Sequence, residues 1–242
     1  MNILGGILFM ALLAGLSTCL GAVLVLVWGR PGRRSFAFFL GLAAGVMLAV
    51  VVLDLLPASL NAGGLSRALP GFAAGLLFMA ALDLCLNKDQ PVPGVGYRYL
   101  KMGYLIAAGI ALHDLPEGLA IAAGFGEPSR LGPLLALAIA LHNIPEGMAT
   151  AAPLSAGGLA PGQVLALNGL VSLVTPFGCW LGMLLLQASP VFLPSLLAMA
   201  AGAMGYIVAA QLWPESHRLH PPLARLGLLG GTLLVVWLNL FL

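Results

Sequence analysis

The sequence predicts an all-α polytopic membrane protein with eight transmembrane helices. Hydrophobic residues make up 61% of the 242 residues and charged residues only 7%, and the mean hydropathy is +1.06. A chain with so little polar side-chain surface cannot cover a water-soluble globule. Its apolar runs are long and continuous rather than alternating over about ten residues, which favours helices over the strands of a membrane barrel.

The spans follow from the charged and Gly/Pro-rich breaks, because about 20 apolar residues are needed to cross about 30 Å of hydrocarbon. Their approximate limits are 2–28, 36–60, 69–87, 100–125, 131–152, 162–187, 191–213 and 223–242. All eight are expected to form one transmembrane domain. The first span has no basic region ahead of it and runs on to Trp28, so we interpret it as a helix rather than a cleaved signal peptide.

Charge placement predicts the orientation. The connections after spans one, three and seven, with their flanks, carry eight Lys or Arg residues, whereas the opposite side carries only Arg67 and Arg130. Because basic residues favour the cytoplasmic side, both termini are predicted to be non-cytoplasmic. The net charge of +2, with its basic residues scattered, leaves no footprint for nucleic acid. The expected surroundings are the lipid bilayer.

An internal repeat predicts how the spans are arranged. Residues 43–60 align without gaps on residues 200–217, an offset of 157, and the same offset places Thr18 on Thr175. Spans one to three therefore correspond to spans six to eight. Because five spans separate equivalent spans, the second copy is inverted in the membrane. The result is a 3+2+3 arrangement with spans four and five as the central pair, a plan common among secondary transporters.

Spans four and five each contain a polar motif in apolar surroundings, ALHDLPEG at 111–118 and ALHNIPEG at 140–147. In each motif His and Glu are four residues apart, so both project from one face of a helix. At about 1.5 Å per residue, each histidine is roughly 18 Å from the basic residue at its end of the helix. Both motifs therefore lie near the middle of the membrane, at matching depth on antiparallel helices.

Ionisable groups at this depth cost on the order of 3 kcal/mol each and are functional by default. The candidate metal ligands are His113, Asp114, Glu117, His142, Asn143 and Glu146. No Lys or Arg lies inside these spans to neutralise the acids, and imidazole nitrogens with carboxylate oxygens suit zinc, Fe(II), Mn, Co, Ni or Cd. Six candidate ligands exceed one tetrahedral shell. One prediction is therefore a two-metal site with bridging glutamates, in which Asp114 and Asn143 serve the second position.

The prolines and glycines of the motifs also favour a cation site in a permeation pathway. Pro116 and Pro145 each remove a backbone hydrogen bond and are predicted to kink their helices beside the ligands. Gly118 and Gly147 allow neighbouring helices to approach closely. A cation bound at a broken, hydrated part of a helix is what a permeation site requires.

Two other interpretations of the motifs stay open. One is a His–Glu pair that links two helices without any ligand. The other is a catalytic metal site, which the residue order disfavours. Membrane metallohydrolases typically show HExxH, and carboxylate di-iron sites favour Glu-x-x-His, whereas here the order is His-x-x-x-Glu with no separate base or nucleophile. The chain is not expected to be an enzyme.

HDLPEG and HNIPEG resemble the paired metal-site motifs of the ZIP (Zrt-, Irt-like protein) family of divalent metal transporters, above all its GufA-like and ZupT-like bacterial branch. The resemblance covers essentially the whole chain and includes the PES signature at 214–216. It implies zinc-type transport toward the cytoplasm across the cell (inner) membrane, often by a homodimer, with one helix bundle moving against another. The metal would be a substrate, and no cofactor is implied.

The resemblance also implies a binuclear ligand set. By position, His113, Glu117, His142 and Glu146 would hold the first metal. Asp114 and Asn143, sharing the two glutamates, would line the second.

The sequence departs from this branch of the family at two places. Thr175 stands where span six usually has a glutamate before its proline, and Gln211 stands in the place of the acid that usually precedes the PES signature. A single-metal site or an altered selectivity is therefore an alternative. Asp54, the repeat equivalent of Gln211, is a candidate for attracting cations at the external mouth, or else a hydrated residue near a helix end.

Three further polar residues lie near the predicted cytoplasmic side. Asp83 is predicted to pair with Lys88, a little over one helical turn further on. The His-rich loop of many relatives is missing. The only histidines in the sequence outside the two motifs are His217 and His220, which either bind metal or are simply solvated.

Overall fold

The computed structural model describes residues 3–27, 32–87, 94–126, 131–185 and 193–240, and within these residues it contains helices and no strands. The α-helices are α1 (Ile3–Val27), α2 (Arg33–Val50), α3 (Leu56–Asn87), α4 (Val95–Gly126), α5 (Leu131–Ala156), α6 (Pro161–Ser172), α7 (Val174–Leu185), α8 (Leu193–Ile207), α9 (Trp213–Leu219) and α10 (Pro221–Asn239). Two π-helical segments, η1 (Val51–Leu55) and η3 (Val208–Leu212), join α2 to α3 and α8 to α9.

Five helical stretches among the described residues are long and apolar enough to cross a membrane. One of them, Arg33–Cys85, is 53 residues long, which is more than twice the length that one crossing needs. The chain is therefore a polytopic helical membrane protein, as its composition predicts.

Two interruptions of the helices can be placed against the predicted spans. Within the predicted break at 61–68, α3 is interrupted by a kink at Gly64, where φ is 63° and ψ is 179°. Glycine adopts such a positive φ without steric cost, so it allows the bend. The predicted span 162–187 matches one apolar stretch, Pro161–Leu184, in which a turn at Leu173 separates α6 from α7.

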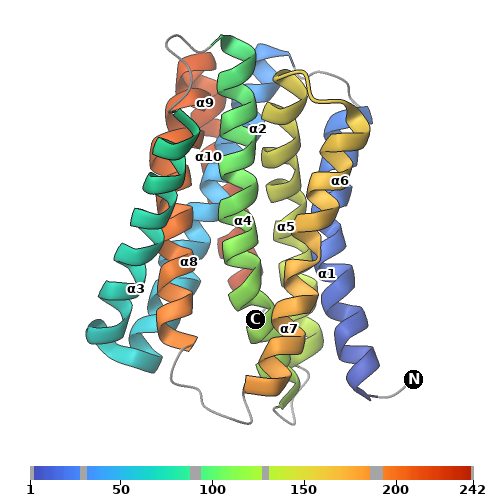
Figure 1. The fold of residues 1–242 in the computed structure, drawn as a ribbon, viewed down its shortest axis with the longest axis vertical. Coiled ribbons are helices and arrows are strands. Elements are labelled where there is room, and N and C mark those ends of the chain that lie inside the picture. The colour runs from blue at the N-terminus through green and yellow to red at the C-terminus, as the bar shows by residue number, and fades with distance from the viewer. Residues whose placement is uncertain (1–2, 28–31, 88–93, 127–130, 186–192, 241–242) are drawn as a thin grey trace.

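The helices form two bundles that lie side by side (Figure 1). The motif bundle consists of α1, α4, α5, α6 and α7, and its name reflects the two repeated motifs on α4 and α5. The flanking bundle consists of α2, α3, α8, α9 and α10 with both π-helical segments. The bundles meet mainly where α4 packs on α8 and where α2 packs on α5. As predicted, α4 and α5 run antiparallel (Figure 1).

The offset found in the sequence also relates features of the structure. The two π-helical segments begin and end 157 positions apart. A Cβ added at Gly21 of α1 would lie 2.0 Å from the carbonyl oxygen of Ile144, and one added at Gly178 of α7 would lie 2.4 Å from that of Leu115. No side chain fits at such distances, so both glycines are needed. Therefore α1 packs on α5 in the same way as α7 packs on α4.

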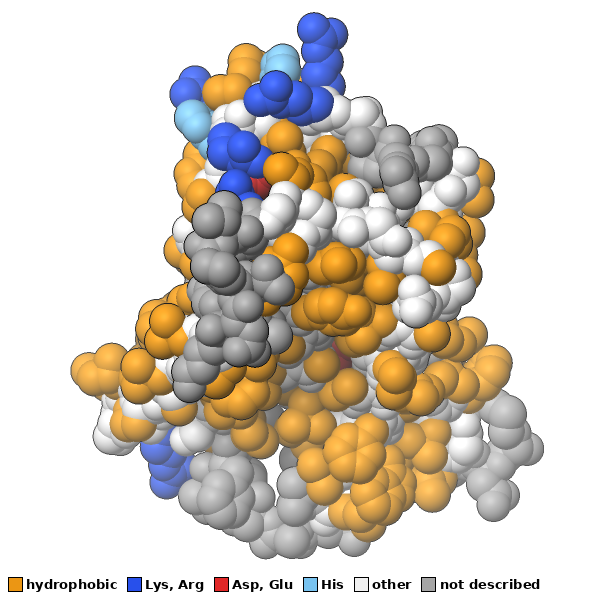
Figure 2. Space-filling view, turned by 45° about the horizontal axis from the view of Figure 1, so that its top comes forward, with side chains coloured by type: hydrophobic (Ala, Val, Ile, Leu, Met, Phe, Trp, Pro, Cys, Tyr) orange, Lys and Arg blue, Asp and Glu red, His pale blue; other side chains and the backbone are white. Residues whose placement is uncertain are grey.

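Basic side chains gather at one end of the molecule (Figure 2). We call this end the basic end. It contains the start of α4, with Arg98 and Lys101, and the junction of α9 and α10, with Arg218 and Arg225 (Figure 1). Large exposed apolar side chains are frequent on the helices, as expected for surfaces that face lipid.

Candidate metal centre

His113, Glu117 and His142 come together between α4 and α5. One ligand atom from each of these three buried residues lies within 4.8 Å of the others. Both imidazoles approach the same carboxylate oxygen, since Glu117 Oε1 lies 2.7 Å from His113 Nε2 and 2.5 Å from His142 Nε2. The four-residue spacing places His113 and Glu117 on one face of α4, and α5 supplies the second imidazole. Such a set of nitrogen and oxygen donors suits zinc and similar divalent ions.

Asp114, Asn143 and Glu146 are buried beside this cluster. Both carboxylate oxygens of Asp114 and of Glu146 lack a hydrogen-bond partner, as does Oδ1 of Asn143. Asn143 Nδ2 donates to the carbonyl oxygen of Ala14 at 3.1 Å, which fixes the amide. Glu146 Oε1 lies 4.0 Å from His113 Nε2. The structure thus brings all six predicted ligands into one region.

The unpaired oxygens determine what this region can bind. Burying a polar group without a partner is costly, and burying an unpaired carboxylate costs more. A divalent cation would satisfy several of these oxygens at once, so the donor set fits a metal ion better than it fits a structural His–Glu link between helices.

The glycine of each motif sits where two helices nearly touch. A Cβ at Gly118 would lie 2.1 Å from the carbonyl oxygen of Thr175, and one at Gly147 would lie 1.9 Å from that of Thr18. The predicted close approach is confirmed at both glycines. The helices continue through both motif prolines, and the kinks predicted there stay a prediction.

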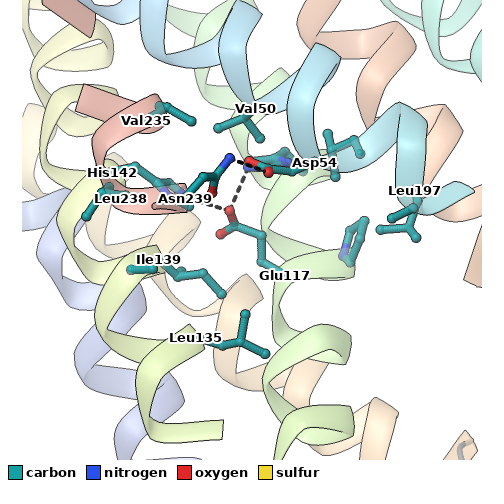
Figure 3. A pocket seen from close by; sticks show the side chains of 15 residues that line it. Val50, Asp54, Glu117, Leu135, Ile139, His142, Leu197, Val235, Leu238 and Asn239 are labelled. Atoms are coloured by element: carbon teal, nitrogen blue, oxygen red, sulfur yellow. Dashed lines mark hydrogen bonds and ion pairs between the residues drawn. The ribbon is translucent and has the colours of Figure 1, made fainter. Parts of the chain in front are cut away.

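A cavity of about 340 Å³ opens onto the cluster of His113, Glu117 and His142 (Figure 3). Its polar lining includes the cluster together with Asp54 and Asn239, and most of the rest is aliphatic. Asn239 Nδ2 donates to Asp54 Oδ1 at 2.8 Å. In Figure 3 the Glu117 carboxylate points toward the side of the cavity where this pair lies. The lining uses the first half of α5 and the last turns of α10, so the cavity extends away from the basic end.

The other two predicted pathway residues lie in different places. Thr175 is fully buried, and its hydroxyl lies next to the Asp114 carboxyl. Gln211 lies at the basic end, away from the residues that line the cavity, and its Nε2 donates to Asp83 Oδ2 at 3.1 Å.

The remaining polar residues have local partners. Lys88, the predicted partner of Asp83, lies outside the described residues, and Asp83 instead pairs with Lys101 of α4. His220 accepts a hydrogen bond from Leu223 N at 3.3 Å and so caps α10. The ring of His217 lies 5.4 Å, centroid to centroid, from that of Trp213.

Sequence reasoning missed Asn239 in the cavity wall and the pairing of Lys101 with Asp83. Asn239 carried one signal, since it is an amide in an otherwise apolar span. Lys101 counted only toward orientation, because nothing in the sequence indicates which helix of the other bundle it would meet.

The fold and the site together define a class: polytopic helical membrane proteins with a cluster of candidate metal ligands buried between two helices. The profile of the family described as ZIP zinc transporter matches residues 87–239. Zinc transporter ZupT of Salmonella arizonae is 35% identical over 228 residues, which is 88% of each chain. The ZupT proteins of Salmonella newport and Salmonella dublin are 34% identical over the same share.

The chain belongs to the ZIP family. This confirms the resemblance that the two motifs indicated. Members of the family are transporters, so the chain is a membrane metal transporter and the alternative of a membrane metalloenzyme is set aside.

Proposed function

We propose that the chain moves zinc, or a related divalent ion such as Fe(II), Mn, Co or Cd, across the cell (inner) membrane into the cytoplasm. One observation carries the proposal: ligand atoms of His113, Glu117 and His142 converge within 4.8 Å, buried at the end of an open cavity. The relatives named as zinc transporters support zinc as the first ion to test.

We further propose one transporter domain over residues 1–242, with eight spans in the 3+2+3 arrangement. The matching positions of η1 and η3 and the paired glycine contacts support the inverted repeat. The basic end would face the cytoplasm by the positive-inside rule. Both termini would then face outward, and so would the mouth of the cavity. A homodimer stays a prediction from the family resemblance.

The geometry supports alternating access. All six candidate ligands belong to α4 and α5, so the motif bundle can carry the ion as one unit. An ion entering the cavity would pass Asp54 and exchange its water for imidazole and carboxylate ligands. Movement of the motif bundle against the flanking bundle, by rocking or in the manner of an elevator, would then open the route toward the basic end.

The number of metals separates two versions of this proposal. In the first, His113, Glu117, His142 and Glu146 hold one ion, while Asp114 and Asn143 share the glutamates with a second, which the unpaired oxygens of Asp114 support. In the other, a single ion binds, which Thr175 favours because it offers a neutral hydroxyl next to Asp114. Anomalous scattering from metal-soaked crystals should give two peaks or one.

Zinc uptake into proteoliposomes tests the function. Glu117→Ala and Glu146→Ala should each reduce uptake to the level of empty liposomes, because each removes a carboxylate from the centre. Glu215→Gln is the matched control, since Glu215 pairs with Arg218 at the basic end, and it should keep uptake within about twofold. Unchanged zinc, cadmium and iron(II) flux in both alanine variants would contradict the proposal.

A further inference from the structure

Four side chains meet at the basic end and join the two bundles. Lys101 of α4, in the motif bundle, forms an ion pair with Asp83 of α3, in the flanking bundle. Their side chains are only 15% and 13% exposed. Tyr206 Oη and Gln211 Nε2 donate to Asp83 Oδ2 at 2.6 and 3.1 Å. One largely buried carboxylate thus connects α3, α4, α8 and η3, and we call these four residues the Asp83 cluster.

Between the Asp83 cluster and the metal centre, the two bundles are in close contact. A Cβ added at Gly109 of α4 would lie 2.9 Å from Cγ1 of Ile207 on α8. Ile207, Met79 of α3 and Ile106 of α4 are almost completely buried. We call these four residues the seam. The seam closes the inner side of His113, whereas the cavity opens its outer side.

Among the residues that the structure describes, the ion pairs between the bundles lie at the basic end. Besides Lys101–Asp83, Arg98 of α4 lies 3.9 Å from Glu215 of α9, but the Arg98 side chain is 55% exposed. An exposed pair at this distance contributes little. On the cavity side, Asp54 is bound by Asn239 within its own bundle.

We propose that the Lys101–Asp83 pair is a latch that holds the two bundles together at the basic end and keeps the seam shut. The latch rests on the proposed function, in which the motif bundle moves against the flanking bundle. Such a movement separates α4 from α3 and breaks the pair. Breaking the pair separates two largely buried opposite charges, which is costly, so the pair biases the protein toward the state with a closed inner side.

Accessibility of a cysteine in the seam tests the latch. The background has Ser in place of Cys19, Cys85 and Cys179, and Ile207→Cys reports on the seam. The protein is placed in lipid nanodiscs without metal, and modification by a charged maleimide is followed over time. Lys101→Met should raise the modification rate at least tenfold, because the closed state loses its buried ion pair and the open state loses nothing.

Two variants serve as controls. Lys101→Arg keeps the charge and should stay within twofold of the parent. Arg98→Met removes the same charge one turn away, from the exposed pair, and should also stay within twofold. A Lys101→Met protein in which Ile207→Cys remains as protected as in the parent would overturn the latch.

A double variant with the two charges exchanged distinguishes loss of the ion pair from damage to the fold. Lys101→Asp combined with Asp83→Lys restores an ion pair between α3 and α4, and it should return the modification rate to within twofold of the parent. If the double variant folds but its Ile207→Cys is modified much faster than in the parent, the latch is overturned. This test can be made even when Lys101→Met alone does not yield monodisperse protein. The modification assay uses no metal and is therefore independent of transport. If zinc uptake fails while the modification rates are as expected, the result counts against the proposed function and not against the latch.

Discussion

The molecule contains two carboxylate–amide pairs, one on the cavity side and one at the basic end, at positions related by the sequence repeat. In the first pair the π-helical segment supplies the carboxylate, and in the second it supplies the amide. On the cavity side, Asp54 of η1 accepts a hydrogen bond from Asn239 of α10. At the basic end, Gln211 of η3 donates to Asp83 of α3. Asp54 and Gln211 are 157 positions apart, and Asp83 and Asn239 are 156 apart. The carboxylate and the amide have therefore exchanged helices between the halves.

The exchange gives the two ends different properties on a repeated backbone. Asp54 pairs with a neutral amide and lines the cavity, so its charge can attract an incoming cation. Asp83 also pairs with Lys101, so its charge is compensated inside the protein. The cavity side thus has an acid paired with an amide, and the basic end has an acid that also pairs with a lysine. The packing of the helices differs as well, because a cavity opens on one side of the metal centre and the seam closes the other.

Replacing each acid by its amide should give the largest contrast. Asp83→Asn leaves the largely buried Lys101 ammonium without its carboxylate and should lower the free energy of unfolding by about 3–5 kcal/mol. Asp54→Asn leaves two amides that can still hydrogen-bond and should cost no more than about 1 kcal/mol. Denaturant unfolding in detergent, followed by Trp fluorescence, measures both. Equal losses of unfolding free energy in the two variants would show that the acids at the two ends contribute equally to stability.

The repeated backbone is tested at the motif glycines. Gly118→Ala and Gly147→Ala each place a methyl group against a carbonyl oxygen, at 2.1 and 1.9 Å, and should each cost about 1–3 kcal/mol. Gly169→Ala in α6 is the control, because a Cβ there meets no atom within 4 Å, and it should be neutral. A loss at only one motif glycine would mean that the halves are not packed equivalently.

The metal centre was predictable because its geometry is local. A four-residue spacing on a helix places His113 beside Glu117 whatever surrounds the helix, and the second copy of the motif predicts the antiparallel partner. The repeat was visible for a similar reason, since Thr18 and Thr175 keep one offset across two spans. Both observations needed only the order of residues along the chain.

The contacts between bundles were not predictable in this way. Lys101 and Asp83 belong to different bundles, and their pairing depends on how far α4 slides along α3 and α8. The turn at Leu173 also has no counterpart in the apolar pattern, because it interrupts a run that is long enough to continue as a helix, whereas the kink at Gly64 falls in the predicted break at 61–68. The sequence therefore predicted the set of candidate ligands more fully than the contacts between the bundles.

A smaller effect is expected on the kinetics of zinc uptake when the charge of Asp54 is removed. Asp54→Asn should raise KM by about 3–10-fold with little change in the maximal rate, because it weakens attraction of the cation and leaves the ligands intact. High salt should shrink the difference, since a hydrated cavity is screened. An unchanged KM at low salt would mean that Asp54 only pairs with Asn239 and that the cavity side is not an electrostatic entrance.

The smallest effect concerns the surface charge of the basic end. Arg218 makes two contacts with Glu215, at 2.9 Å from Nε and 2.5 Å from Nη2, but its side chain is 52% exposed. Arg218→Ala should therefore change the free energy of unfolding by no more than about 0.5–1 kcal/mol, and salt should reduce even that. The same denaturant series that includes Asp83→Asn measures it. If the two losses were equal, the basic end would be held by its charges collectively, and the burial of Lys101 would not be what distinguishes it from the cavity side.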